Sequence, residues 1–351
     1  MKPSIFTTSG DSGLSRLMRR IANSRDIGRG LLVCVTIALA TTFIADHYGG
    51  PTLLYALLFG MSLHFLSDEG LCQKGIEFAA RTVLRLGVAL LGARMTFDQV
   101  GELGIGPVLT VIGSVAIVIL SGAVLARMLG LQRDLGLLTG GAVAICGASA
   151  ALALSAAMPR HENSERNTIL TVVGVTTLST VAMVVYPLIA GVLTLTNTQA
   201  GIFLGGTIHD VAQVVGAGYM ISEETGDTST LVKLVRVAML VPAVMVFMWL
   251  FRASRKEESG ASKIPMLPGF LVGFVVLVVI NSLGLIPDAV NEGMSTLSRW
   301  CLVTAIAALG IKTSFQKLAV VGWKPVILMA LETLLLLAIV LGVVLFGGLG
   351  V

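Results

Sequence analysis

Residues 82–108 read TVLRLGVALLGARMTFDQVGELGIGPV, and residues 300–326, 218 positions later, read WCLVTAIAALGIKTSFQKLAVVGWKPV. Eight of the 27 aligned positions are identical, including a Leu-Gly pair, a Phe and a Gly-x-x-Pro-Val ending. This agreement is well above what composition alone would give. An internal duplication in a hydrophobic chain predicts a transporter, because many secondary transporters consist of two repeats around a central site.

The composition excludes an ordinary soluble protein. Hydrophobic residues make up 55% of the 351 residues, charged residues 13%, and mean hydropathy is +0.91. Soluble globular domains contain about 25% charged residues. Apolar stretches long enough to cross a bilayer recur along the chain and lack the alternation of a barrel. The sequence therefore predicts an all-α polytopic membrane protein.

We expect residues 1–29 to form a basic cytoplasmic tail and residues 30–351 a single transmembrane domain. About eleven membrane segments are expected, and they are 30–46, 51–66, 74–95, 104–129, 135–158, 166–194, 199–221, 229–251, 267–283, 293–312 and 325–349. With the N-terminus inside, sixteen Lys and Arg residues fall inside and five outside, as the positive-inside rule favours. The two copies then cross in opposite directions, so we expect an inverted-topology repeat.

Two segments contain more glycine and polar residues than a plain span. The fifth includes Thr139, Gly140, Gly141, Cys146, Gly147 and Ser149, and the seventh includes Gly205, Gly206, His209, Asp210 and Gln213. Glycine allows a helix to unwind, and the ends of a broken helix bind ions. We expect two broken helices that form a substrate or ion site. The alternative is close packing of small residues.

The polar residues of the seventh segment favour function. A membrane aspartate normally faces a partner or a wet cavity, so Asp210 is a candidate for binding a proton or a cation. His209 and Gln213 are four residues apart and would share one helical face. The alternative is a buried polar cluster that ties helices together.

Cations inside the segments form a second set of candidates. Glu77, Arg81 and Arg85 lie at helical spacing, and a Glu77–Arg81 ion pair would leave Arg85 free. Arg85 and Arg236 are candidates for binding an oxyanion, because a guanidinium offers a planar fork of donors. Snorkelling to the membrane interface is the alternative for Arg81 and Lys233. Glu332 has no evident partner in the sequence.

The sequence contains no phosphate loop, HExxH motif or Gly-x-Ser-x-Gly elbow, so we expect neither an enzyme nor a cofactor. The four cysteines and the isolated histidines lack metal-ligand spacing, and no metal site is expected. The basic pI follows from the loop charges and does not predict nucleic-acid binding.

Three blocks resemble a known family. ICGASA at 145–150, GGTIHDVAQVVGAG at 205–218 and VKLVRVAMLVP at 232–242 resemble the YeiH-type family of bacterial membrane proteins, which are described as sulfate exporters. Family members often have Glu where this chain has Asp210. The family is similar in fold to cation–proton antiporters and anion transporters with crossed broken helices. Proteins of that fold are often dimers, so a homodimer is one partner that the resemblance implies.

We therefore predict a secondary transporter that exports a small anion, such as sulfate or an organic sulfonate, coupled to H⁺ or Na⁺ across the lipid bilayer. Half-helix N–H groups with Thr139, Ser149 and Gln213 would bind its oxygen atoms, and Arg85 or Arg236 would balance its charge. Asp210 with His209 would bind the coupling ion. A cation–proton antiporter using Asp210 is the first alternative, and a membrane-embedded enzyme is the second.

Overall fold

The computed structural model describes residues 13–67, 70–96, 101, 103–159, 163–252, 269–313 and 323–347, with side chains from residue 26 onward. These ranges are helical and contain no strand, which confirms the predicted class. The helices are α1 (Gly13–Tyr48), α2 (Thr52–Ser62), η1 (His64–Ser67), α3 (Gly70–Phe78), η2 (Ala79–Val83), α4 (Leu84–Leu91), η3 (Gly92–Arg94), α6 (Ile105–Met128), α7 (Arg133–Ala144), α8 (Ala148–Ala157), α9 (Ser164–Val192), α10 (Asn197–Thr207), α11 (Val211–Ile221), α12 (Glu223–Ala238), α13 (Leu240–Leu250), α14 (Gly269–Ser282), α15 (Asp288–Lys312) and α17 (Trp323–Phe346).

Six helical stretches in the described part are long and apolar enough to cross a membrane. They are Asp26–Tyr48, Ile105–Met128, Ser164–Val192, Glu223–Leu250, Asp288–Lys312 and Trp323–Phe346. Four further apolar helices, among them α2 and α14, are shorter. The expected count of about eleven crossing segments is not confirmed. A separate difference is that α1 begins at Gly13, within the expected tail.

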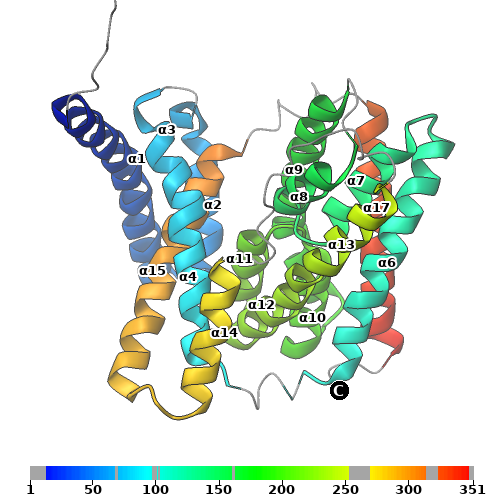
Figure 1. Ribbon diagram of the computed structural model, residues 1–351. Coiled ribbons are helices and arrows are strands. Elements are labelled where there is room, and N and C mark those ends of the chain that lie inside the picture. The colour runs from blue at the N-terminus through cyan, green and yellow to red at the C-terminus, as the bar shows by residue number, and fades with distance from the viewer. Residues whose placement is uncertain are drawn as a thin grey trace, which may run out of the picture.

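The helices form two groups (Figure 1). The first helix group contains α1 to α4, α14 and α15, and the second contains α6 to α13 and α17. Within the second group, α11 packs against α2 and α15 of the first. The two groups thus meet beside a glycine-rich segment.

Glycine allows close helix contact inside the first group. A Cβ at Gly310 of α15 would lie 2.3 Å from the Leu57 carbonyl oxygen of α2, and a Cβ at Gly92 would lie 2.3 Å from the Phe274 carbonyl oxygen of α14. Gly92 and Gly310 are identical positions of the two sequence copies. Each of them brings a helix backbone against its neighbour, where a Cβ would collide with a carbonyl oxygen.

The helix bounds agree with the 218-residue separation of the two sequence copies. Adding 218 to the bounds of the helical stretch Gly70–Arg94 gives those of Asp288–Lys312, and adding 218 to the bounds of Ile105–Met128 gives those of Trp323–Phe346. The colours of Figure 1 show that α4 and α15 run in opposite directions, as do α6 and α17. The duplicated sequence therefore coincides with helices of equal length and opposite direction.

Each glycine-rich segment is two helices, as predicted, but each folds back on itself. Hairpin B (197–221) consists of α10 and α11. Thr225, four residues beyond α11, donates from Oγ1 to the Asn197 carbonyl oxygen (3.2 Å) at the start of α10. The two ends of hairpin B therefore lie at the same end of the bundle.

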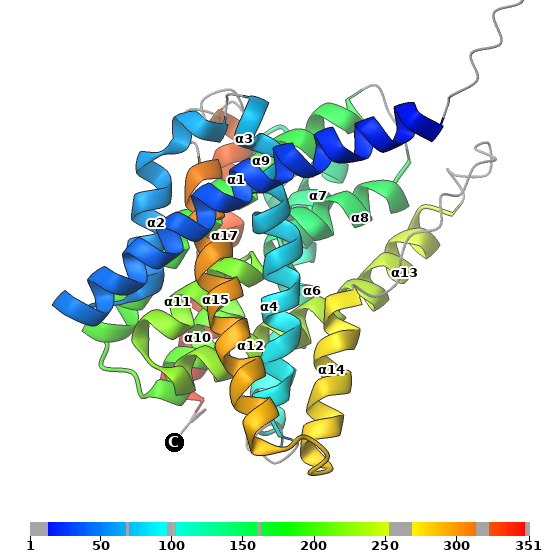
Figure 2. The same cartoon turned by 90° about the vertical axis from the view of Figure 1, so that its left-hand side faces the viewer.

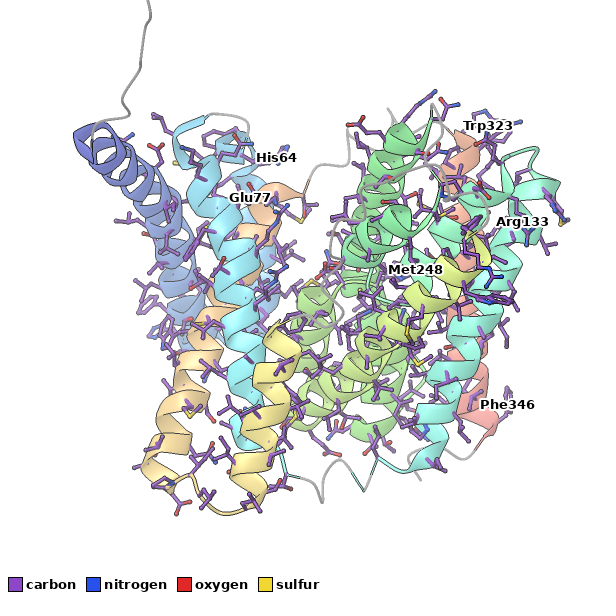
Figure 3. All side chains as sticks on the ribbon, viewed as in Figure 1. His64, Glu77, Arg133, Met248, Trp323 and Phe346 are labelled. Atoms are coloured by element: carbon purple, nitrogen blue, oxygen red, sulfur yellow. The ribbon has the colours of Figure 1, made fainter. Side chains whose placement is uncertain are left out.

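Hairpin A (133–157), which consists of α7 and α8, has the same course from the opposite end. Gln132 before α7 and Met158 after α8 line one small cavity. Arg133 lies toward the Trp323 end of α17, opposite Phe346 (Figure 3). Figures 1 and 2 show α7 and α8 in the upper half of the molecule and α10 and α11 in the lower half. The two hairpins thus enter from opposite ends, and their tips meet in the middle.

Candidate functional site

The hairpin tips are short non-helical breaks at Ile145–Gly147 and Ile208–Asp210. Gly147 has φ +64°, a left-handed conformation that side chains rarely adopt, and it lets the chain reverse between α7 and α8. A Cβ at Gly147 would lie 3.7 Å from the His209 Cβ. The two breaks are therefore in direct contact, and they bring Cys146 and Gly147 together with His209 and Asp210.

Two fully buried cations from α12 bind the carbonyl groups of the tips. Arg236 donates from Nε to Ala144 O (3.0 Å) and from Nη2 to Val143 O (2.9 Å) at the end of α7. Its Nη1 donates to Gly205 O (3.1 Å) and Ile208 O (3.0 Å) at the end of α10. These are carbonyl groups that a helix end leaves without an intrahelical partner. Arg236 therefore joins the C-terminal ends of both broken helices.

Lys233, one turn earlier on α12, acts in the same way. Its Nζ donates to Ile145 O (2.8 Å) and Ile208 O (3.0 Å), one from each tip. The side chain is fully buried, so the snorkelling alternative is wrong for this residue. Positive charge stabilises the negative end of a helix dipole, and here two cations serve two such ends.

The N-terminal ends of α8 and α11 differ. Asp210 Oδ1 accepts from the Ala212 N–H (2.8 Å), so its own carboxylate occupies the positive end of α11. The start of α8 has no side-chain cap, and Ser149 in its first turn is exposed. Free N–H groups and the helix dipole make such an end suitable for an anion.

His209 links both hairpins to α17. Its Nδ1 lies 3.1 Å from Val143 O, and its Nε2 lies 3.0 Å from Thr333 Oγ1. Since a carbonyl oxygen only accepts, Nδ1 carries the proton, and Nε2 of the neutral ring accepts from the threonine hydroxyl. Both ring nitrogens are therefore engaged, and this geometry favours the tether that was the alternative for His209.

Gln213 leaves one buried acceptor unused. Thr180 Oγ1 donates to Thr176 O (3.0 Å), so the 2.8 Å contact of Gln213 with Thr180 uses the amide Nε2 as donor. Gln213 Oε1 is then buried without a hydrogen-bond partner in the described structure. Such a group is normally satisfied by water, an ion or a ligand.

Thr139 faces a partner that the sequence did not reveal. Its Oγ1 lies 2.8 Å from Glu332 Oε1, and Glu332 is fully buried on α17. The other carboxyl oxygen, Oε2, has no partner among the described residues. The two residues are 193 positions apart, so no local pattern could have paired them.

The remaining predicted residues have varied surroundings. Gly205 and Gly206 pack against Ser229 and Val340, while Gly140 and Gly141 pack against Val118 and Leu154. Cys146 is buried at the tip of hairpin A. These four glycines therefore make the close helix contacts expected if small residues serve packing and not substrate binding.

Arg85 is exposed on α4 of the first helix group, and the structure does not bring it to the tips. The expected ion pair beside it is confirmed, with Arg81 Nη2 2.9 Å from Glu77 Oε1.

Several contributors were missed by sequence reasoning. Ser179 accepts from the Asp210 N–H (3.0 Å), and Thr180 and Thr333 hold Gln213 and His209. These hydroxyl residues occur in apolar helices where serine and threonine usually bond their own backbone, so their sequence gives little signal. The spacing of Lys233 and Arg236, three apart on one helical face, was the signal available for a shared role.

A cavity of about 360 Å³ lies between the two helix groups, away from the hairpin tips. Arg94, Tyr219, Glu223 and Arg299 are among its lining residues. Arg94 Nη2 lies 3.1 Å from Glu223 Oε2 and 3.5 Å from Asp227 Oδ2. This ion-pair cluster therefore joins the end of α4 to the start of α12, across the boundary between the groups.

Comparison with known proteins places the chain in a family. The family described as Conserved hypothetical protein 698 matches residues 29–329. A UPF0324 membrane protein of Chlorobaculum tepidum is 54% identical over 314 residues, 89% of this chain and 88% of that protein. UPF0324 membrane protein TauZ of Paracoccus denitrificans is 52% identical over 309 residues, 88% of this chain and 91% of that protein. No solved structure matches.

These matches cover nearly all of the helical bundle, including both hairpins and α12. They confirm the resemblance that the glycine-rich blocks indicated. In the described ranges, no group of three or more His, Cys, Asp or Glu could hold a metal ion. The chain belongs to the UPF0324 family of membrane proteins, the YeiH-type family.

Proposed function

We propose that this protein is a secondary transporter of a small anion, with its substrate site at the meeting tips of hairpins A and B. The observation that carries the proposal is the charge at the tips. Lys233 and Arg236 are fully buried there, and Asp210 is the carboxylate beside them. The start of α8, uncapped and partly exposed, lies next to these charges.

The balance of charge supports an anion. Each helix end contributes about half an elementary charge, and the two N-terminal and two C-terminal ends at the tips cancel. Two basic side chains and one acidic side chain then leave an excess of one basic group at the tips. A buried net charge in a membrane protein is costly unless a counter-ion compensates it, so a bound anion would complete the site.

The residues have separate roles in this proposal. The N–H groups of α8 and the Ser149 hydroxyl bind the oxygen atoms of sulfate or an organic sulfonate. Asp210 and the free Gln213 Oε1 present acceptors to the coupling ion, H⁺ or Na⁺. Arg236 and Lys233 supply positive potential while their donors remain on the carbonyl groups. Arg85 on the exposed face of α4 would attract anions toward the site.

The opposite directions of the two hairpins and of the offset helices support alternating access by an inverted repeat. Loop charge supports a cytoplasmic N-terminus in the bacterial inner membrane. If the hairpins fold back, Arg166 at the start of α9 joins the side of the N-terminus. Among the described residues of the five, Arg94 and Arg299 then remain on the opposite side. This distribution satisfies the positive-inside rule better than eleven crossing segments.

A thermal-unfolding scan of the purified protein tests the proposal. Sulfate, sulfite, thiosulfate, taurine and bicarbonate are compared with Na⁺, K⁺ and a pH series at constant ionic strength. We expect one oxyanion to raise Tm, because a ligand that binds only the folded state stabilises it by mass action. Ser149→Ala should weaken this shift, and Ser155→Ala at the other end of α8 is the matched control. If none of these oxyanions raises Tm, the proposal is contradicted.

A cation–proton antiporter is the second candidate, and the unpartnered Gln213 Oε1 beside Asp210 favours it. Both groups accept hydrogen bonds or coordinate cations, and neither attracts an anion. Stabilisation by Na⁺ or K⁺ alone, lost in Asp210→Asn, would establish this alternative. Stabilisation by an oxyanion that persists in Asp210→Asn would exclude it as the sole function.

A further inference from the structure

Glu332 is a buried acid that the proposed site does not use. It lies in the middle of α17, with its side chain fully buried and Oε2 without a hydrogen-bond partner in the described part of the chain. Its other oxygen contacts Thr139 Oγ1 at 2.8 Å. A carboxylate with so few donors is strongly disfavoured away from water, so this environment calls for the neutral acid.

The hydroxyl of Thr139 leads to the same conclusion. It lies 3.0 Å from Leu135 O and 3.3 Å from Gly136 O, as well as 2.8 Å from Glu332. It has one proton to donate, and threonine in a helix normally donates it to the carbonyl group one turn earlier. In this geometry the hydroxyl also donates toward Glu332 Oε1, so it shares its one proton among three oxygen atoms. Glu332 therefore receives at most one shared hydrogen bond, which is too little to stabilise a buried carboxylate.

The space around the carboxyl group is a shaped notch. A Cβ at Gly122 of α6 would lie 2.7 Å from Glu332 Oε1 and 2.4 Å from the Gly136 carbonyl oxygen of α7. Glycine at this position therefore makes room for the acid between α6 and α7. The residue 218 positions earlier on α6 is Ser114, which is buried and bonds its own helix at Val111 O (2.9 Å). Because the corresponding position of α6 holds a serine, packing α17 into the bundle does not by itself require an acid at position 332.

The surroundings of Glu332 contain little charge. The helices packed against α17 are α6, α7, α9 and α10. Among the described residues of these helices, none places a charged group close enough to act on Glu332. The titratable group that faces the same turn is His209, through its bond to Thr333. Lys233 and Arg236 are on α12 and bind the carbonyl groups of the tips. The proton on Glu332 therefore has no nearby cation to replace it.

We propose that Glu332 is a proton-binding site that couples transport to a proton gradient, an inference that rests on the transporter function proposed above. In the described state the carboxyl group holds one proton and bonds hairpin A through Thr139. When hairpin A moves to release the anion, the acid meets water and gives up this proton. The ionised acid then binds one proton from the opposite side of the membrane before the contact with Thr139 re-forms. Release on one side and uptake on the other move one proton per cycle, on a residue outside the anion site.

Infrared difference spectroscopy on the reconstituted protein tests the protonation directly. We expect the carbonyl stretch of a protonated acid in the wild type and its loss in Glu332→Gln, which keeps the shape and an acceptor for the Thr139 hydroxyl. The band should change when sulfate, sulfite, thiosulfate, taurine or bicarbonate is added, or when pH is raised. Absence of the band would overturn the proposal. A band that no anion and no pH alters would mean a fixed structural acid and would also overturn it.

Vesicle transport of labelled sulfate separates this inference from the proposed function. Glu332→Gln should retain sulfate–sulfate exchange but lose stimulation by a pH gradient, while Glu332→Asp should retain part of it. Ser114→Ala, at the corresponding position of α6, is the matched control and should behave as wild type. Stimulation of Glu332→Gln equal to wild type would contradict the proposal. If the wild type moves no sulfate, transport of sulfate fails as a function, and the infrared bands still decide the role of Glu332.

Discussion

At the scale of single residues, Asp210 combines a structural and a chemical role that one substitution can separate. Asparagine caps helices about as well as aspartate, so Asp210→Asn should keep the bond from Ala212 N–H and the fold. It removes the charge that would bind a coupling ion at the anion site, which is separate from the proton proposed for Glu332. We expect ion-coupled transport of sulfate to be abolished, with Tm close to wild type. Asp288→Asn, an exposed carboxylate in the first turn of α15, is the control. Normal coupled transport by Asp210→Asn would refute its coupling role.

Arg236 should behave differently, because its guanidinium binds four carbonyl oxygens. Arg236→Gln leaves most of them unsatisfied in a buried site, and breaking a buried charged network typically costs about 3–5 kcal/mol. We expect a large fall in Tm, measured in detergent. Arg85→Gln on the exposed face of α4 should change stability by about 0.5 kcal/mol or less. Stability equal to wild type in Arg236→Gln, with loss of anion binding, would instead place the guanidinium on the substrate.

At the scale of helices, glycine pairs decide how closely the first helix group packs. Gly310→Ala places a Cβ 2.3 Å from the Leu57 carbonyl oxygen, so α2 and α15 must separate. Overpacking of this kind typically costs about 1–3 kcal/mol. Gly113→Ala on α6 is the control, since a Cβ there meets nothing within 4 Å and alanine favours a helix. A Tm that falls only in Gly310→Ala is the expected result, and equal Tm values would contradict the packing argument.

The helix breaks could be predicted from sequence, but the course of the chain after them could not. Gly-Gly pairs followed by polar residues marked both tips, because glycine and buried polar groups weaken an apolar helix. The fold-back was missed because α7 with α8, and α10 with α11, together have the length and hydropathy of one span. The direction of the second helix of a hairpin depends on contacts between residues distant in sequence, such as that of Thr225 with Asn197. The partners of Glu332 and Lys233 could not be predicted, because Thr139 and Ile145 are remote from them in sequence.

At the scale of the whole molecule, the two hairpins make a prediction that distinguishes them from crossing segments. The natural cysteines Cys34, Cys72, Cys146 and Cys301 are first replaced, and single cysteines are then introduced at exposed positions. Gln132→Cys and Glu165→Cys flank hairpin A, while Thr194→Cys and Ile221→Cys flank hairpin B. Labelling intact cells with a thiol reagent that cannot cross membranes reports which sites face outward.

If both hairpins fold back, the two sites that flank each hairpin lie on one side. We expect labelling at Thr194→Cys and Ile221→Cys, and protection at Gln132→Cys and Glu165→Cys until the membrane is permeabilised. Eleven crossing segments require each pair to split, with one site labelled and one protected. A split pair would therefore refute the fold-back. Inverted access of the two pairs would keep the hairpins but reverse the orientation that the loop charges favour, because each hairpin would then open to the other side.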